Sequence, residues 1–491
     1  MNKSSTLARH ALLTLALSGC FASVAAFADT PPQDIPVRLQ SLLEPDTEAP
    51  KPRPLTIKGW RTTMGSKVLF IRTTASPMFD VHVSFDAGSI RGNVAGLAAT
   101  TFSMLNEGIP GMDNHQAVIA AFENQGAELG MHFDQQRSAF SLRSLSAVDK
   151  RTPALHLFSQ ILGKPLLSDK ALALVKNEMK NRLQNNAQNP SHIALQQLKE
   201  QLAPQSPYAS PALGTKEGLE SLTRQAVQDF HRQAYSARTT QITLVGDLTL
   251  EEAQLISQQI SGALPNTLPA SPTVPSLPPA TAPTRSHLER TQRQTHLLLA
   301  QPSVPRKHDD HLALEAARRI FDNRLSTALR QERGLVYGTD IQNWNWAANG
   351  LMVIALRTSP QYSQGIEALT RSMFDQYLRD GPTQRELDQL KRRTKSQNAH
   401  DSSSNAQILL RLVHINREDR PLDLDYDAGQ MQRLSLEQIK QALNRHLAAE
   451  RWHVVTTGPS VDQHPLPTPT TTPDATSSKD TCRAGQVFMA S

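Results

Sequence analysis

Short apolar runs recur along the chain and alternate with longer stretches whose apolar residues follow helical spacing. The short runs are rich in β-branched residues and are bounded by Gly, Ser, Pro or Asp, so they predict strands at 68–74, 79–85, 138–145, 296–301 and 350–357. The longer stretches predict two pairs of helices, 171–185 with 193–202 and 383–400 with 406–416. Strands interleaved with helices in both halves indicate an α+β fold.

The end of each half carries the same pattern, which indicates an internal duplication. A helical stretch leads into a β-branched run that stops at glycine, and the matching positions keep one offset without gaps: Leu222 with Leu434, Val227 with Ile439, and Gly246 with Gly458. Thr223 and Ser435 occupy the N-cap position of the helix in each copy, and Gln438 completes a capping box in the second. Both halves are therefore expected to close with a helix followed by a strand.

Proline-rich and polar segments divide the 491 residues into parts. A chain of this length exceeds what one hydrophobic core supports, so two domains are expected. The composition predicts an extended arm at 29–54, a first domain at 55–264, a stiff Pro-rich linker at 265–284, a second domain at 285–458 and a disordered tail at 459–491.

Residues 1–28 have the features of an export signal. Lys3 and Arg9 give a positive start, an apolar run follows, and Ala26-Phe27-Ala28 fits a small-x-small cleavage site. Leu17-Ser18-Gly19-Cys20 also resembles a lipobox, so lipid anchoring at Cys20 stays open beside simple cleavage. Both alternatives place the protein in the bacterial envelope, with the periplasm favoured. The mature chain then keeps one cysteine, Cys482, in the polar tail.

Composition excludes several classes of function. The hydrophobic fraction of 38% and the charged fraction of 20% are those of a globular protein, and no stretch after the signal is long and apolar enough to span a bilayer. The net charge of +6 is scattered, and the cluster at 391–393 lies in a helical stretch where a solvated face is expected. We therefore expect no nucleic-acid partner.

The most informative segment is the helical stretch 96–105, which reads Gly-Leu-Ala-Ala-Thr-Thr-Phe-Ser-Met-Leu. Its surroundings resemble those of an H-x-x-E-H zinc helix. A strand and glycine turn precede it at 79–89, Ser206-Pro207-Tyr208 and Val245-Gly246-Asp247 follow, and a segment at 329–337 carries Arg330 and Tyr337. In this combination the chain resembles the M16 peptidases, the family of pitrilysin and mitochondrial processing peptidase, over roughly residues 55–458.

The resemblance implies a fold of two homologous M16-type (LuxS/MPP-like) α/β sandwich domains, each a sheet with helices on one face, that close around a substrate cavity. It also implies that the three zinc-helix positions are Ala99, Phe102 and Ser103. Alanine and phenylalanine offer no lone pair, and a neutral serine hydroxyl is a poor zinc ligand. We therefore expect no metal and no cofactor in this chain, and no peptidase activity from it alone.

The M16 resemblance implies that Arg330 and Tyr337 contact the substrate and the transition state in trans, from the half opposite the metal. The chemistry suits that role, because a guanidinium donates several hydrogen bonds and a phenol can stabilise an oxyanion. The alternative is that Arg330 pairs with a carboxylate such as Glu332 and that Tyr337 only packs.

Other possible ligands are more simply structural. Glu178 is expected to be a surface or ion-paired residue, and one carboxylate on a helix is no metal site. The string His308-Asp309-Asp310-His311 precedes a helical stretch, where acidic residues favour the helix N-terminus. His82 and His132 lie in or beside strands, where a satisfied or exposed imidazole is the default.

Two functions remain. The first is a non-catalytic subunit of a periplasmic M16 zinc peptidase heterodimer, which binds unfolded or extended peptide while a catalytic M16 partner supplies zinc. The alternative is a non-enzymatic structural or peptide-binding M16 homologue. The sequence does not identify the natural substrate, and it leaves both a heterodimer and a homodimer open.

Overall fold

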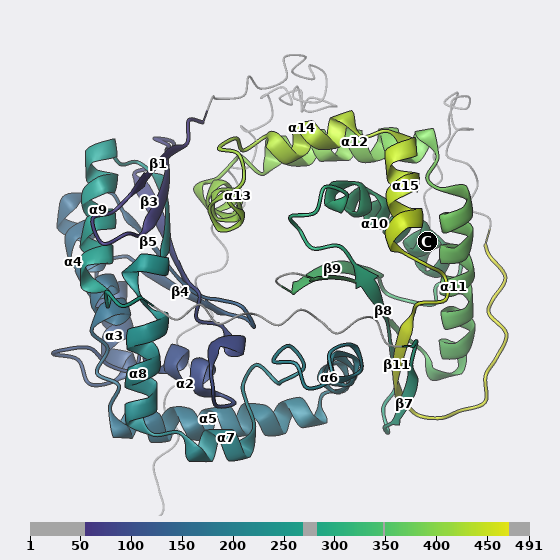
Figure 1. Cartoon of the computed structure of the whole chain (residues 1–491), viewed down its shortest axis with the longest axis horizontal. Helices are drawn as coiled ribbons and strands as arrows, with labels where there is room; N and C mark the ends of the chain where they lie inside the picture. Colours follow the sequence, from purple (N-terminus) through teal and green to yellow (C-terminus); the bar gives the residue numbers. More distant parts are fainter. Residues whose placement is uncertain (1–54, 269–281, 347–348, 471–491) are drawn as a thin grey trace, which may run out of the picture. The chain divides into compact units, whose positions relative to one another are not determined.

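The computed structural model of the chain describes residues 55–268, 282–346 and 349–470 (Figure 1). The predicted signal 1–28 with Cys20, the arm 29–54, the middle of the linker 265–284, and Cys482 lie outside these residues. The described residues belong to one compact unit with two β-sheets, one in each half of the sequence. The α+β class is therefore confirmed.

The first sheet has six strands in the order β1-β2-β6-β3-β5-β4. Strands β2 and β6 are parallel, and the other neighbours are antiparallel. The central strand β3 is buried at most of its positions, as expected for a strand covered on both faces. The strands are β1 Lys58–Arg61, β2 Lys67–Arg72, β3 Met78–Phe85, β4 Glu128–Phe133, β5 Ser138–Leu145 and β6 Gln241–Gly246.

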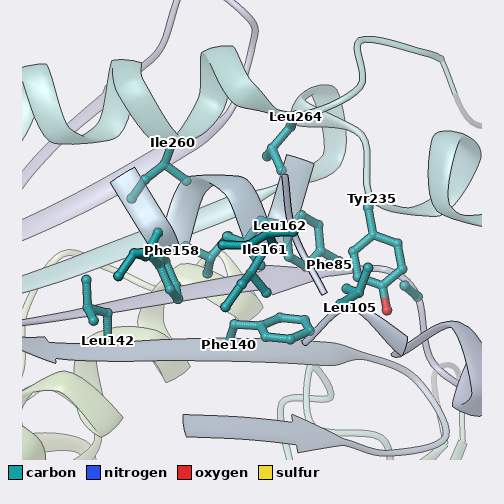
Figure 2. Close-up of a cluster of buried hydrophobic side chains, with 14 of the residues drawn as sticks. Phe85, Leu105, Phe140, Leu142, Phe158, Ile161, Leu162, Tyr235, Ile260 and Leu264 are labelled. Atoms are coloured by element: carbon teal, nitrogen blue, oxygen red, sulfur yellow. The ribbon is translucent and has the colours of Figure 1, made fainter. Parts of the chain in front are cut away.

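Helices of the first half cover one face of this sheet and bury its aromatic residues. Figure 2 shows Phe85 and Phe140 from the strands facing Phe158 and Ile161 from α4, and all four side chains are inaccessible to solvent. The helices are η1 Ser89–Arg91, α2 Leu97–Met104, α3 His115–Glu123, α4 Val148–Gly163, α5 Asp169–Gln188, α6 Pro190–Leu202, α7 Lys216–Ser221, α8 Arg224–Ala234, η2 Ala237–Thr239 and α9 Leu250–Ala263.

The second sheet has five strands in the order β7-β11-β8-β10-β9. Strands β7 and β11 are parallel, and the remaining pairs are antiparallel. Its last strand, β9, is an edge and pairs with β10. The strands are β7 Arg285–Glu289, β8 Thr295–Ser303, β9 Asp340–Trp346, β10 Asn349–Thr358 and β11 His453–Gly458.

The second half has its own core, built around a line of aromatic rings. Phe374 lies 5.2 Å from Phe321 and 4.9 Å from Trp452 between ring centroids, both in edge-to-face geometry. The helices of this half are α10 His311–Ser326, η3 Thr327–Gln331, η4 Pro360–Tyr362, α11 Ser363–Asp380, α12 Gln384–His400, α13 Asn405–Glu418, α14 Tyr426–Arg433 and α15 Leu436–His446.

The internal duplication is confirmed, because α8 leads into β6 just as α15 leads into β11. Thr223 caps α8 by accepting from the Ala226 amide at 3.2 Å. Ser435 caps α15 by accepting from the Gln438 amide at 3.2 Å, and the Gln438 side chain accepts from the Ser435 amide at 2.9 Å. The expected N-caps and capping box are therefore present.

Each sheet is also covered by a helix from the other half of the sequence. Ile408, Leu409, Leu412 and Ile415 of α13 pack on Leu69, Ile71 and Val245 of the first sheet. Ala194, Leu198 and Leu202 of α6 pack on Ala300, Leu351, Val353 and Val455 of the second sheet. The expectation of helices on one face is therefore incomplete, since this reciprocal exchange covers the opposite faces.

Polar contacts fix α13 on the first sheet. The Asn416 side-chain amide donates to the Ile242 carbonyl at 2.9 Å and to the Thr243 hydroxyl at 3.0 Å. Lys67 donates to the Asn416 carbonyl at 2.9 Å and pairs with Asp419 at 2.6 Å. Because the amide is buried, these bonds define one position of the helix on the sheet.

Composition predicts a disordered tail over 459–491, but residues 459–470 form an extended segment held against the second half. The His464 amide donates to the Gln361 carbonyl at 2.8 Å, and Leu466 packs over Gly365 at the second core. Thr470 donates to the Glu332 carbonyl through its amide and its hydroxyl, each at 2.8 Å. The expectation of disorder is corrected for these residues, because backbone pairing and one apolar anchor order a proline-rich segment.

Among the helices that the structure describes, none has the length and apolar character needed to cross a membrane.

The exchanged helix α13 offers a matched pair of leucines. Leu412 is fully buried, whereas Leu410 is 69% exposed. Leu412→Ala is expected to lower the free energy of unfolding by about 3 kcal/mol, because it leaves a cavity against the first sheet. Leu410→Ala is expected to change it by less than about 0.5 kcal/mol. Chemical denaturation measures both, and equal effects would contradict the packing of α13 on the sheet.

Substitution by alanine is expected to have opposite effects on stability at two glycines, Gly214 and Gly262. Gly214 has φ +87°, and a Cβ there would lie 2.4 Å from the backbone of Gly96 at the start of α2. Gly214→Ala is expected to lower the melting temperature, because backbone must move and φ is strained. A Cβ on Gly262 meets nothing within 4 Å, so Gly262→Ala in α9 is expected to stabilise by about 0.5 kcal/mol. A neutral Gly214→Ala would argue against this close approach.

Candidate functional site

The positions that the M16 resemblance equates with the zinc helix, Ala99, Phe102 and Ser103, lie on α2, which is fixed at its start by close backbone packing. Gly96 precedes the helix in the left-handed conformation with φ 93°. A Cβ at Gly96 would lie 2.8 Å from the Leu219 side chain and 3.0 Å from the Leu213 carbonyl. Leu97 and Ala98 are then buried in the first core. The frame of the helix is thus tightly held although its ligand positions are altered.

Aromatic rings surround Phe102, the residue that the M16 resemblance aligns with the glutamate of the H-x-x-E-H pattern. The ring of Phe102 lies 5.2 Å from Phe133 and 5.1 Å from Phe140 between centroids. Ala99 is 1% exposed, and Ser103 is half-buried. A dication placed here would lose water and gain at best one neutral hydroxyl, so this face of α2 cannot hold a catalytic zinc ion.

Carboxylates near α2 do not replace the missing ligands. Glu178 on α5 is half exposed and pairs with Arg182 at 2.6 Å, so the expectation of an ion-paired surface residue is confirmed. Burial raises the pKa of Glu107, and the charge of Glu178 raises it further, whereas His115 lowers it. Glu107 and His115 are 3.9 Å apart. His115, Glu107 and Glu178 provide one imidazole and two carboxylates, whereas the H-x-x-E-H helix provides two imidazoles on one helical face.

Of the two strand histidines, His132 follows the structural expectation, whereas Nδ1 of His82 is buried without a hydrogen-bond partner among the described residues. Burial and then the charge of Arg137 lower the pKa of His82 to about 4, so its imidazole is neutral at pH 7. His132 lies 3.5 Å from Asp134, and this hydrogen-bonded contact raises the pKa of His132.

In the segment 308–311, His308 and His311 do not act as a pair on one helical face. Asp310 is the N-cap residue of α10, so the acidic residues do lie at a helix N-terminus. Burial and then Arg306 lower the pKa of His311. His308 and Asp310 instead meet His446 at the end of α15, a residue that the sequence did not connect with them. No local spacing reveals this contact, since α15 is distant in the chain.

Arg330 and Tyr337 flank one loop of the second half. Arg330 lies in a π-helical turn, η3, one residue before its end, and the loop is closed by the Leu335 amide donating to the Leu329 carbonyl at 2.8 Å. Tyr337 is 88% exposed. Across the residues that the structure describes, Arg330 forms no ion pair, whereas Glu332 pairs with Arg333 at 3.1 Å. The alternative in which Glu332 neutralises Arg330 therefore has no support in the geometry.

Tyr337 and Arg330 line two adjoining cavities. Tyr337 lines a cavity of ≈ 780 Å³ between α6 and the second sheet, together with Leu195, Trp344 and Val353. Arg330 lines a cavity of ≈ 440 Å³. Gly338 and Thr339 border both cavities, so the two side chains belong to one continuous surface. Trp344 was not singled out in the sequence; its place on the edge strand β9 is what gives it a candidate role.

Comparison with known proteins agrees with this geometry. The family profile described as "Peptidase M16 inactive domain" matches residues 221–394. A crystal structure of a peptidase M16 inactive domain from Pseudomonas fluorescens is 36% identical with a TM-score of 0.80, and the match covers 84% of this chain and 100% of that one.

Two further proteins are more distant. The non-peptidase homolog YmxG of Helicobacter pylori is 22% identical over 394 residues, which cover 77% of this chain and 88% of that protein. The first half of the periplasmic protease PqqL from Escherichia coli is 12% identical with a TM-score of 0.69, over 82% of this chain and 92% of that structure. The second similarity concerns the fold alone.

The two sheets, the absence of histidine from α2, and the 36% identity to a solved relative agree with one another. The chain belongs to the M16 peptidase family, as an inactive homologue of the non-catalytic type.

Proposed function

We propose that this chain is the non-catalytic subunit of an M16 zinc peptidase heterodimer, in which it binds extended peptide and presents Arg330 and Tyr337 to the zinc site of a catalytic partner. The observation that carries the proposal is the contrast between two sites in one chain. The zinc helix is filled by Phe102 and its aromatic neighbours, whereas Arg330 and Tyr337 remain exposed.

The loop that carries the pair is held in place without using either side chain. Its backbone is tied by the Leu329 to Leu335 hydrogen bond, and Thr470 donates twice to the Glu332 carbonyl. An exposed tyrosine on a fixed loop adds little to folding, because it buries almost no apolar area. A phenol and a guanidinium that has no ion pair within residues 55–268, 282–346 and 349–470, both held on a rigid support, suit contact with a developing oxyanion and with substrate backbone.

Extended peptide can add as a strand at a sheet edge, and the edge strands are β1 and β4 in the first sheet and β7 and β9 in the second. In the described residues, β4 pairs with β5 alone, and β9 pairs with β10 alone. The edge strand β9 borders the ≈ 780 Å³ cavity beside Tyr337, whose lining includes Leu195, Trp344 and Val353. Backbone pairing with the edge gives sequence tolerance, and the cavity accepts an apolar side chain of the peptide.

The need for a partner follows from the missing ligands. Because α2 offers no imidazole, hydrolysis by this family's chemistry requires zinc held by another chain. The name of the Pseudomonas fluorescens relative, an inactive domain, supports this reading. The export-signal pattern of residues 1–28 and the description of PqqL as periplasmic support a periplasmic location.

The name of YmxG, a non-peptidase homolog, favours the second candidate, a structural or peptide-binding M16 homologue with no share in proteolysis. The two candidates differ in what Arg330 and Tyr337 do. A purely structural protein has no use for an exposed pair beside a cavity. Affinity capture from the native envelope separates them, since recovery of a zinc-bearing M16 chain supports the heterodimer.

Activity is expected only in a mixture with the catalytic partner. The purified chain, a candidate partner with an intact H-x-x-E-H helix, and their mixture are assayed on an unfolded polypeptide. We expect hydrolysis by the mixture well above the sum of the parts, and none after the partner's motif glutamate is replaced by Gln. Strong hydrolysis by this chain alone, or no gain on mixing, contradicts the proposal.

Substitution of the pair is expected to lower turnover without preventing assembly. Tyr337→Phe removes one hydroxyl donor and is expected to reduce kcat of the mixture by about a hundredfold, as loss of an oxyanion donor does. Arg330→Ala is also expected to reduce kcat of the mixture. Arg392→Ala, which changes an exposed arginine on α12, is the control and is expected to leave turnover unchanged. Size-exclusion chromatography verifies that each variant still pairs; unchanged kcat in the first two variants would remove their role.

A further inference from the structure

Three possible metal ligands from separate segments meet at the end of α15. His308 comes from the loop before α10, Asp310 is the N-cap residue of α10, and His446 is the last residue of α15. One ligand atom from each lies within 4.8 Å of the other two. The rings of His308 and His446 stand edge to face with centroids 4.9 Å apart.

We propose that His308, Asp310 and His446 bind a divalent transition metal ion, with Zn²⁺ as the preferred ion, at a site separate from the degenerate helix α2. Two imidazoles and one carboxylate are donors that zinc accepts, and the solvent exposure of His308 leaves room for water in the fourth position. Ligand atoms around tetrahedral zinc are about 3.3 Å apart, given bonds of about 2.0 Å. Small side-chain movements bring the three groups to that spacing.

The existing contacts already hold two of the ligands together. Asp310 Oδ2 lies 2.7 Å from His446 Nε2. The Asp310 amide donates to His308 Nδ1 at 3.1 Å, which places that ring beside the carboxylate. The proton between Asp310 and His446 occupies the position that a metal ion would take. A metal ion bound between Asp310 Oδ2 and His446 Nε2 would replace this hydrogen bond by two coordinate bonds, with the ring proton of neutral His446 carried on Nδ1.

Arg445 is the group that opposes metal binding. Its Nη1 donates to the same oxygen, Asp310 Oδ2, at 2.7 Å, so its charge competes with a cation for the carboxylate. The Arg445 side chain is 59% exposed and can leave this contact for solvent. Because Arg445 competes with the metal ion for Asp310, removal of the arginine is expected to raise the affinity for the ion. A chance group of surface histidines would not show this increase.

An ion at this position would link two elements of the second half. Helices α10 and α15 pack against each other, and Asp310 joins the start of one to the end of the other through His446. His308 and Asp309 also line a cavity of ≈ 1220 Å³ that is bordered by α10, α13 and α14. The ion would thus stabilise the wall of this cavity. Its role is structural, because its ligands join the start of α10 to the end of α15.

The test is a zinc titration of the untagged full-length chain after removal of metal by a chelator. Isothermal titration calorimetry with Zn²⁺ alone is expected to show one site per chain, and a saturating ion is expected to raise the melting temperature. His446→Ala, Asp310→Asn and His308→Ala are each expected to weaken binding by about tenfold or more. His400→Ala, an exposed histidine on α12, is the matched control and is expected to leave binding unchanged.

Arg445→Gln provides the decisive variant, because a misfolded protein cannot gain a specific site. It is expected to tighten zinc binding by about threefold, the effect of removing one partly exposed competing charge. No binding by the wild-type chain, unchanged binding in all three ligand variants, or equal loss in His400→Ala would overturn the proposal. None of these measurements involves a partner or hydrolysis, so their failure leaves the proposed peptidase subunit function unaffected.

Discussion

The exchange of helices between the two sheets is the constraint on which the rest of the structure depends. One face of each sheet is covered by helices of its own half. Without the exchanged helices, the other face would expose apolar residues such as Leu69, Ile71 and Val353. Helix α13 covers the first of these faces and α6 covers the second. Because burial of apolar area is the main stabilising term, neither sheet is complete without the other half. The buried amide of Asn416 then sets the position of α13, since its donors are satisfied by the first sheet alone.

The position of α2 does not depend on metal-ligand side chains. The helix is held by Gly96, by the loop around Gly214, and by Leu97 and Ala98 in the core, none of which is a ligand position. Replacing a charged site by Phe102 on Phe133 and Phe140 removes the need to desolvate ionisable groups and adds aromatic packing. The change is thus compatible with the fold, and it closes the position to a metal ion.

Local signals predict the elements of this chain well. The N-cap positions of Thr223 and Ser435 and the strand at 138–145 follow from residues close together in sequence, and the structure confirms them. The altered ligands at Ala99, Phe102 and Ser103 could likewise be read from one short segment. The helix exchange could not, because amphipathic spacing in α6 and α13 shows that a face is apolar but not which sheet covers it. Residues 459–470 were missed for a related reason, since proline and polar composition conceals a single anchor such as Leu466.

The contact of His308 and Asp310 with His446 illustrates the same limit for chemistry. The string at 308–311 contains four possible ligands, but local spacing directs attention to His308 and His311 as a pair. The helix turn carries His311 into contact with the charge of Arg306, while α15 brings His446 to the N-cap of α10. A metal site assembled from a loop, an N-cap and a distant helix end exists only after the second core has formed. Sequence motifs therefore find sites built on one helix, such as H-x-x-E-H, and overlook sites whose geometry depends on the packing of two helices.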